Sequence, residues 1–174
     1  MADPVLQAKE SPGWARRGLR RVGVESTGNK DGDQMEYKQF GDNFLIRLHR
    51  GEEVVSTLTD FVRARSIQAG SVSGIGAVSD PRLGFFDPAT REYRQEEFAG
   101  GYEVVNMAGN VSVLEGVEML HIHATVADDH HQTRAGHLFQ ATVSVTLEVV
   151  ITRFDGRLER RLDDSIGLNL LDLA

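Results

Sequence analysis

Residues 138–154 read LFQATVSVTLEVVITRF, a long run dominated by β-branched and aromatic residues. These residue types pack well on the pleated surface of a sheet, so the run predicts a strand. The Asp155-Gly156 pair that follows is typical of a hairpin turn, and residues 157–162 are predicted to form the next strand. This part of the sequence favours a fold built mainly from strands.

The strand pattern extends back along the chain to about residue 71, and one more strand is predicted before that point. Five further strands are predicted at residues 43–49, 82–86, 91–98, 102–113 and 117–126. A turn with proline at its second position is expected at residues 87–90. The Gly74-Ile75-Gly76-Ala77 segment follows a helix and does not open one, which argues against a phosphate-binding loop. Its glycines instead predict a bulge or a close approach of two backbones.

Residues 52–65 are predicted to form the one main helix. Their apolar residues fall on a single stripe at helical spacing: Val54, Val55, Leu58, Phe61 and Val62. Acidic residues at the amino end and basic residues at the carboxyl end also match the helix dipole. One helix among seven or eight closely spaced strands predicts an α+β fold with a largely antiparallel sheet.

The chain of 174 residues suits one domain with a tail. Residues 1–36 are polar and glycine-rich and are predicted to be a flexible tail, which leaves residues 37–174 as the folded domain. There is no run of about 18 apolar residues and no signal-peptide core, so no membrane partner is expected and the cytoplasm is the expected location. Because the chain has no cysteine, any metal must be held by imidazole and carboxylate groups.

The net charge of −7 is unevenly distributed. Residues 1–40 hold seven Lys/Arg against six Asp/Glu (+1), and residues 41–174 hold twelve against twenty (−8). An acidic folded region repels phosphate, so it makes a poor surface for nucleic acid. Any contact with DNA is therefore assigned to the basic tail, at Arg16, Arg17, Arg20 and Arg21. A solvated segment without a partner is an equally good interpretation of these arginines.

Three histidines give the strongest chemical signal. His121 and His123 lie in the predicted strand 117–126, where residues two apart project from the same face. His137 follows fourteen residues after His123, and Gly136 before it is expected to let the backbone turn tightly and bring this third imidazole alongside by a loop. Three nitrogen ligands suit Zn²⁺ or a similar metal and leave a coordination position open. The alternative is three hydrogen-bonded histidines near a sheet edge.

Other polar residues near these segments are weaker candidates. His130 and His131 lie in a polar loop and are expected to be solvated, not ligands. Glu103 and Glu148 lie within apolar strands, where each carboxylate is solvent-facing, paired or turned toward a site. A carboxylate near a metal could serve as a general base, but the solvent-facing interpretation is favoured for both.

The order of motifs resembles the plants-and-prokaryotes conserved (PPC) domain, also called domain of unknown function 296. The resemblance covers roughly residues 41–155 and rests on three segments: Gly74 to Ser79 (GIGAVS), residues 102–112 (YEVVNMAGNVS), and the HIH and GHL motifs at His121 and His137. It implies a compact α+β domain that assembles as a homotrimer. His121, His123 and His137 match the family's histidine positions, which in single-domain prokaryotic members look suited to a metal.

The resemblance also carries a DNA-binding label, because the family's domain accompanies AT-hook motifs in plants. The Arg-Gly-Arg-Pro core of an AT-hook does not occur here, and the tail arginines only loosely resemble it. We therefore expect a cytoplasmic homotrimer with a three-histidine site for a divalent metal, zinc, in a regulatory or interaction role with DNA binding implied by the family. The alternatives are a metal-dependent hydrolase or lyase that acts on a small molecule, and a DNA-binding regulator that works through its tail.

Overall fold

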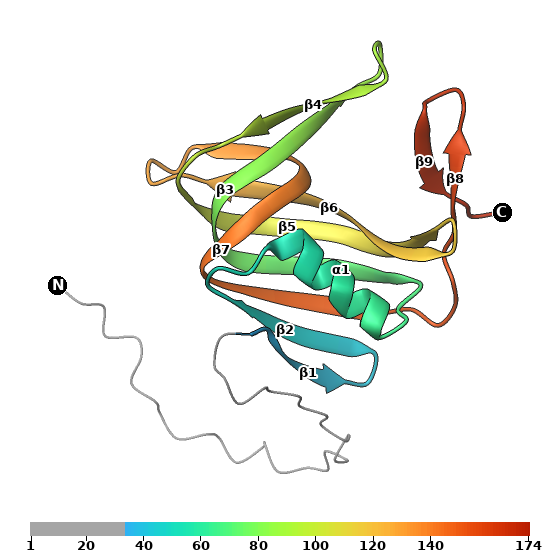
Figure 1. Ribbon diagram of the computed structural model, residues 1–174, viewed down its shortest axis with the longest axis horizontal. Coiled ribbons are helices and arrows are strands. Elements are labelled where there is room, and N and C mark those ends of the chain that lie inside the picture. Colours follow the sequence, from blue (N-terminus) through green and yellow to red (C-terminus); the bar gives the residue numbers. More distant parts are fainter. Residues whose placement is uncertain (1–33) are drawn as a thin grey trace, which may run out of the picture.

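The computed structural model describes residues 34–174 (Figure 1). Its elements, in chain order, are β1 (Glu36–Phe40), β2 (Asn43–His49), α1 (Val54–Ala64), β3 (Gly70–Asp87), β4 (Glu92–Glu97), β5 (Gly101–Leu114), β6 (Val117–Ala127), β7 (Thr133–Arg153), β8 (Arg160–Asp163) and β9 (Leu168–Leu171). Within this part of the chain no helix is long and apolar enough to span a membrane. The four tail arginines lie outside the described residues.

Seven strands form one antiparallel sheet in the order β1-β2-β7-β6-β5-β3-β4. An additional pairing joins β7 to β3, so the path β3-β5-β6-β7 closes on itself. With one helix beside this sheet, the predicted α+β class is confirmed. The two longest strands exceed the prediction. The predicted strand 82–86 and the glycine-rich segment before it are both parts of β3, and β7 begins at Thr133 instead of residue 138.

The length of β7 follows from the number of its partners. Its carboxyl-terminal half pairs with β2 and with the start of β3, as in Leu48↔Leu147 and Gly74↔Val149. Its amino-terminal part pairs with β6 on one side and with the end of β3 on the other. One continuous strand therefore links the edge formed by β1 and β2 to the closed part formed by β3, β5, β6 and β7.

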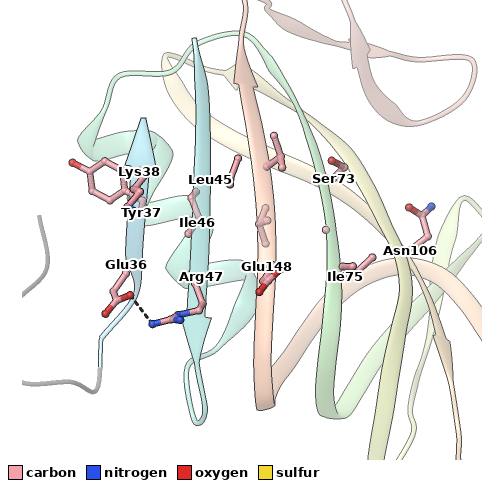
Figure 2. A pocket seen from close by; sticks show the side chains of 13 residues that line it. Glu36, Tyr37, Lys38, Leu45, Ile46, Arg47, Ser73, Ile75, Asn106 and Glu148 are labelled. Carbon is pink, nitrogen blue, oxygen red and sulfur yellow. Dashed lines mark hydrogen bonds and ion pairs between the residues drawn. The ribbon is translucent and has the colours of Figure 1, made fainter. Parts of the chain in front are cut away.

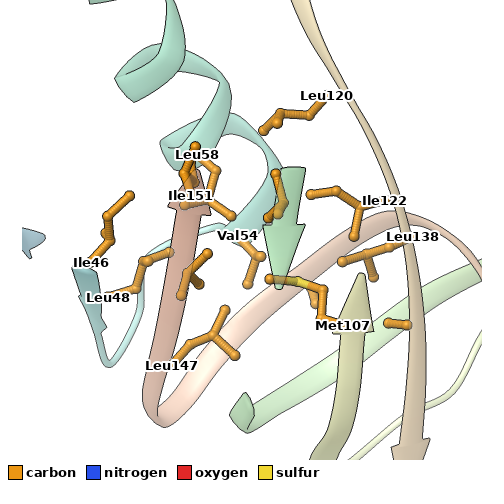
Figure 3. Close-up of a cluster of buried hydrophobic side chains, with 14 of the residues drawn as sticks. Ile46, Leu48, Val54, Leu58, Met107, Leu120, Ile122, Leu138, Leu147 and Ile151 are labelled. Atoms are coloured by element: carbon orange, nitrogen blue, oxygen red, sulfur yellow. The ribbon is translucent and has the colours of Figure 1, made fainter. Parts of the chain in front are cut away.

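The helix packs against one face of the sheet, and the main hydrophobic core lies between them. Leu48 of β2, Leu58 of α1 and Leu147 of β7 are all fully buried, and Figure 3 shows them in one cluster with Leu120 and Ile122 of β6. Burying such a side chain contributes about 1.5–3 kcal/mol. The apolar stripe predicted for the helix is the face that packs here.

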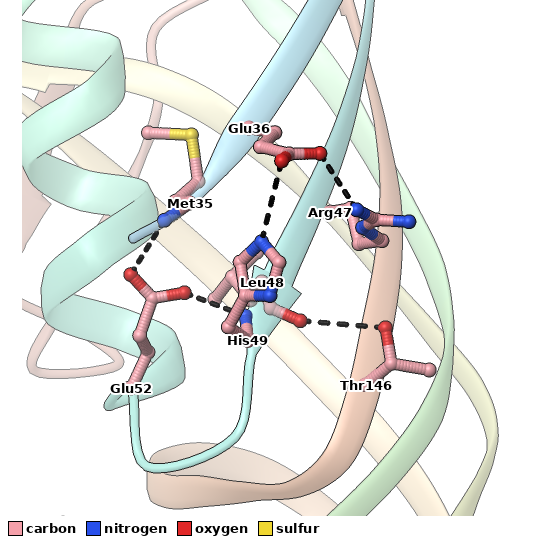
Figure 4. Close-up of polar contacts among 7 residues, drawn as sticks. All are labelled: Met35, Glu36, Arg47, Leu48, His49, Glu52 and Thr146. Atoms are coloured by element: carbon pink, nitrogen blue, oxygen red, sulfur yellow. Dashed lines mark hydrogen bonds and ion pairs between the residues drawn. The ribbon is translucent and has the colours of Figure 1, made fainter. Parts of the chain in front are cut away.

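Two neighbouring glutamates fix the start of the helix. Glu53 is the N-cap, and its carboxylate accepts hydrogen bonds from the backbone N–H groups of Val55 and Ser56. It also accepts one from Ala141 of β7. Glu52 accepts from the backbone N–H groups of Met35 and His49 (Figure 4). Both carboxylates therefore bind the helix entry to adjacent strands, a more specific role than the favourable dipole expected for them.

The predicted irregularity at Gly74-Ile75-Gly76 is confirmed. The register between β3 and β5 shifts between Gly74 and Gly76, which marks a bulge. Gly76 has φ +153°, and a Cβ atom there would lie 2.3 Å from the carbonyl oxygen of Thr146. Glycine is thus required because the backbones of β3 and β7 approach closely.

The carboxyl-terminal segment differs from the prediction. β8 pairs with β9 in a separate two-stranded sheet and not with β7, and β9 was not predicted. The hairpin joins the main domain where the backbone N–H of Val113 donates to the carbonyl of Leu158, so it stands beside the ends of β5 and β6 (Figure 1). This position brings Arg160 of β8 close to His121 of β6.

Candidate metal centre

His121, His123 and His137 lie together at the junction of β6 and β7. One ligand atom from each lies within 4.8 Å of the others. His121 and His123 share a face of β6, as the strand period predicts. His137 does not come from a loop: it lies within β7, directly opposite His123 in the register. The ring centroids are 5.1 Å apart for His121–His123, 5.0 Å for His121–His137 and 5.5 Å for His123–His137.

Gly136 is needed here for a different reason from the one predicted. It lies inside β7 and pairs with Ala124 of β6, so no tight turn occurs at this point. A Cβ atom on Gly136 would lie 2.7 Å from the carbonyl oxygen of Gly84 in β3. Glycine therefore allows β3 and β7 to approach closely beside His137, which pairs with Gly84 of β3 as well as with His123 of β6.

Aromatic side chains enclose His137. Its ring centroid lies 5.2 Å from that of Tyr93 on β4 and 4.5 Å from that of Phe139 on β7. Burial, and then the neighbouring His121, His123 and Arg160, lower the pKa of His137 to about 4. Its Nδ1 atom is buried and has no hydrogen-bond partner among the described residues. A neutral imidazole with an unpaired nitrogen is the form that a metal ligand requires.

His121 is also partly buried, and its ring lies directly beside a guanidinium group. Burial lowers its pKa, and the guanidinium of Arg160 and the ring of His123 lower it further. Nη2 of Arg160 lies 3.3 Å from Nδ1 of His121. His123 is exposed, so the cluster opens to solvent at this residue.

Arg160 is the site residue that the sequence did not reveal. It lies on β8, 23 residues beyond His137, in a segment whose only signal is three arginines in positions 157–161. The separate β8–β9 hairpin brings it to the cluster, and hairpin docking of this kind has no local sequence pattern.

The other candidates lie away from the cluster. His130 and His131 are exposed in the β6–β7 loop, as expected. Glu103 and Glu148 are both exposed, in agreement with the solvent-facing interpretation. Glu148 lines a groove on the outer face of β1, β2, β7 and β3 (Figure 2). Within residues 34–174 the cluster of potential metal ligands contains imidazoles alone.

This donor set fits a borderline divalent metal. Three histidines are a known ligand set for zinc, and separations below 4.8 Å allow the three nitrogen atoms to face one ion. The Nδ1 atom of His137 is buried without a hydrogen-bond partner among the described residues, and a bond from this atom to a metal would offset the cost of its burial.

A family model for the Plants and Prokaryotes Conserved (PCC) domain, also abbreviated PPC, matches residues 35–155. The chain belongs to this family. The match includes all three histidines and ends before β8, so Arg160 lies outside it.

Two solved structures extend the comparison. One, from Bacteroides thetaiotaomicron VPI-5482, is named a "putative dna binding protein"; it is 32% identical with a TM-score of 0.78 and covers 80% of this chain and 97% of that one. The other, a metal-containing protein from Archaeoglobus fulgidus, is 33% identical with a TM-score of 0.71 and covers 76% of this chain and 94% of that one.

A curated relative is much longer. The bifunctional protein GlmU of Synechococcus sp. (strain JA-2-3B'a(2-13)) is 28% identical over 159 residues, which is 90% of this chain. The chain spans only 23% of the length of that relative. The likeness therefore concerns one part of that protein.

Proposed function

We propose that this PPC protein binds one divalent metal ion, zinc, through His121, His123 and His137. The observation that carries the proposal is the convergence of three imidazole nitrogens, one from each histidine, within 4.8 Å. His137 in addition has a buried Nδ1 atom without a hydrogen-bond partner among the described residues. The metal-containing Archaeoglobus fulgidus relative supports it. A bound metal would supply Lewis acidity toward an oxygen atom of a small ligand. The chain's own residues hold the ion, exclude water on the Tyr93–Phe139 side and leave access beside His123.

Metal analysis of the full chain, purified without a histidine tag, tests this proposal. We expect one equivalent of metal per chain. The double variant His121→Ala/His123→Ala should lose this metal, because a single remaining imidazole is too few ligands to retain a divalent ion through purification. The control is His130→Ala/His131→Ala, which removes two exposed histidines from the neighbouring loop. Equal metal content in the two double variants would refute the site.

We also propose that the protein acts as a homotrimer. Leu45 and Ile75 are 50% and 59% exposed, and both line the groove of about 770 Å³ in Figure 2. Polar and charged residues surround these apolar side chains, among them Arg47 and Glu148. An apolar patch with a polar rim is typical of a protein–protein interface.

For the wider role, a regulatory or interaction function remains our leading proposal. DNA binding is the second candidate, and the name of the Bacteroides relative favours it. The −8 charge of residues 41–174 would confine DNA to the tail arginines. A metal-dependent hydrolase or lyase is the third candidate, favoured by the solvent access beside His123. A location in the cytoplasm stays a prediction.

A further inference from the structure

Arg160 is held beside the histidines by neutral acceptors. Its Nε atom donates to Oγ of the fully buried Ser112, and its Nη2 atom donates to Oδ1 of Asn110, both at 2.8 Å. Its Nη1 atom donates to the carbonyl of Asn169 at 2.8 Å. The ion pairs found in residues 34–174 do not include Arg160, whereas its neighbour Arg161 pairs with Asp172 at 2.8 Å. The guanidinium is therefore oriented and half-buried, and its charge has no carboxylate partner in the described chain.

The contact between Arg160 and His121 is incompatible with a metal-bound His121. A guanidinium can only donate, so Nδ1 of His121 must accept the hydrogen bond at 3.3 Å. An imidazole that binds a metal through Nδ1 has no lone pair left there. One that binds through Nε2 carries its proton on Nδ1 and is itself a donor. Metal binding consequently breaks this contact in either case and frees an N–H group of Arg160 at the edge of the site.

The resulting charges favour a bound anion. Three neutral imidazoles, a divalent ion and a guanidinium form a strongly positive cluster that contains no carboxylate among the described residues. Without a counter-charge, Arg160 would repel the metal, because unit charges a few ångströms apart in a partly buried site interact strongly. A small anion that contacts both groups removes this repulsion and takes up the freed N–H.

We propose that Arg160 forms an anion subsite that binds the carboxylate of a small-molecule ligand next to the metal. This inference rests on the proposed metal centre and adds the ligand class to it. The hydrogen bonds to Ser112 and Asn169 hold the guanidinium in position while the N–H released by His121 binds the ligand. Because Arg160 lies beyond the family match at residue 155, the subsite belongs to the carboxyl-terminal hairpin and not to the shared domain.

Acetate binding to the Co²⁺-loaded full chain tests the subsite, with visible absorption of the metal as the readout. We expect Arg160→Gln to raise the Kd for acetate about tenfold, since a hydrogen bond to a charged group is lost. The matched control is Arg161→Gln, the same change on the next residue of β8, which should leave the Kd unchanged. Imidazole, a neutral ligand, should bind equally to all three proteins.

Each outcome has a separate meaning. Wild-type protein that takes up no Co²⁺ overturns the metal centre and the subsite with it. Stoichiometric Co²⁺ with equal acetate affinity in wild type and Arg160→Gln overturns the subsite alone. Loss of Co²⁺, or of acetate and imidazole together, in Arg160→Gln assigns Arg160 a purely structural role and also overturns it. Arg160→Lys is the second variant, because it keeps the charge but not the shape of the guanidinium. The preference of Arg160→Lys for acetate over imidazole should fall between those of the wild type and Arg160→Gln. A preference equal to that of Arg160→Gln would contradict the role of the charge.

Discussion

At the residue scale, the three imidazoles meet because two of them follow the period of one strand and the third follows the register between two strands. His121 and His123 could be paired from the sequence because the period of a strand is a local property. The position of His137 could not, because it depends on the register between β6 and β7. Register is set by the packing of whole strands and by the close approach at Gly136, which the sequence suggested for the wrong reason.

Gly136→Ala tests this close approach. The added methyl group would lie 2.7 Å from the carbonyl oxygen of Gly84, so β3 and β7 must separate. We expect the free energy of unfolding to fall by about 2 kcal/mol and the metal content to decrease, as measured by chemical denaturation and metal analysis. The control is Gly101→Ala, where a Cβ meets nothing within 4 Å and no positive φ is required. Equal stability of the two variants would contradict the argument.

The pKa of His137 predicts how the metal-free protein responds to acid. Folding lowers this pKa from 6.5 to about 4, so the unfolded chain binds more protons in this interval. The free energy of unfolding should therefore fall as the pH decreases from 6.5 to about 4. Above pH 6.5 the imidazole is neutral in both states, so His137 should add no further dependence on pH. Urea denaturation of the metal-free protein at several pH values measures it. His137→Gln should show a shallower slope, and an unchanged slope would assign the effect to other groups.

At the element scale, the helix was predictable because its apolar stripe and flanking charges are contained in fourteen residues, 52–65. The long strands were divided or shortened in the prediction because β3 and β7 keep their pairing by changing partners along their length. The β8–β9 hairpin was missed because its docking depends on a few tertiary contacts such as the Val113–Leu158 hydrogen bond. Sequence patterns report local periodicity, and these features are not local.

The N-cap at Glu53 gives a prediction at this scale. Glu53→Ala removes the acceptor of three backbone N–H groups, two in the helix and one in β7. We expect a loss of about 1–2 kcal/mol in the free energy of unfolding, measured by chemical denaturation. Glu103→Ala, at an exposed glutamate on β5, is the control and should change stability by less than about 0.5 kcal/mol. A smaller effect at Glu53 than at Glu103 would contradict the capping role.

At the scale of the whole molecule, the outer groove predicts the assembly. Leu45→Glu/Ile75→Glu places two charges on the apolar surface that we propose to lie between protomers. Light scattering coupled to size-exclusion chromatography should give three chains for the wild type and one for the double variant, because buried unpaired charges disfavour an interface. Phe85→Glu is the control: Phe85 is 61% exposed on the same strand but lies outside the groove. A wild-type monomer would refute the proposed trimer.

The strand β7 has one more consequence, which concerns how the protein tolerates insertions and deletions. Its 21 residues supply both His137 and the groove residues Glu148 and Val150. Since side chains alternate along a regular strand, one residue added between His137 and Glu148 would reverse the faces of the residues on one side of it unless it formed a bulge. The histidine cluster and the groove are therefore locked in phase with each other. Changes in length are accommodated more readily outside β7, for instance in the exposed loop at residues 129–132 or beyond Arg153.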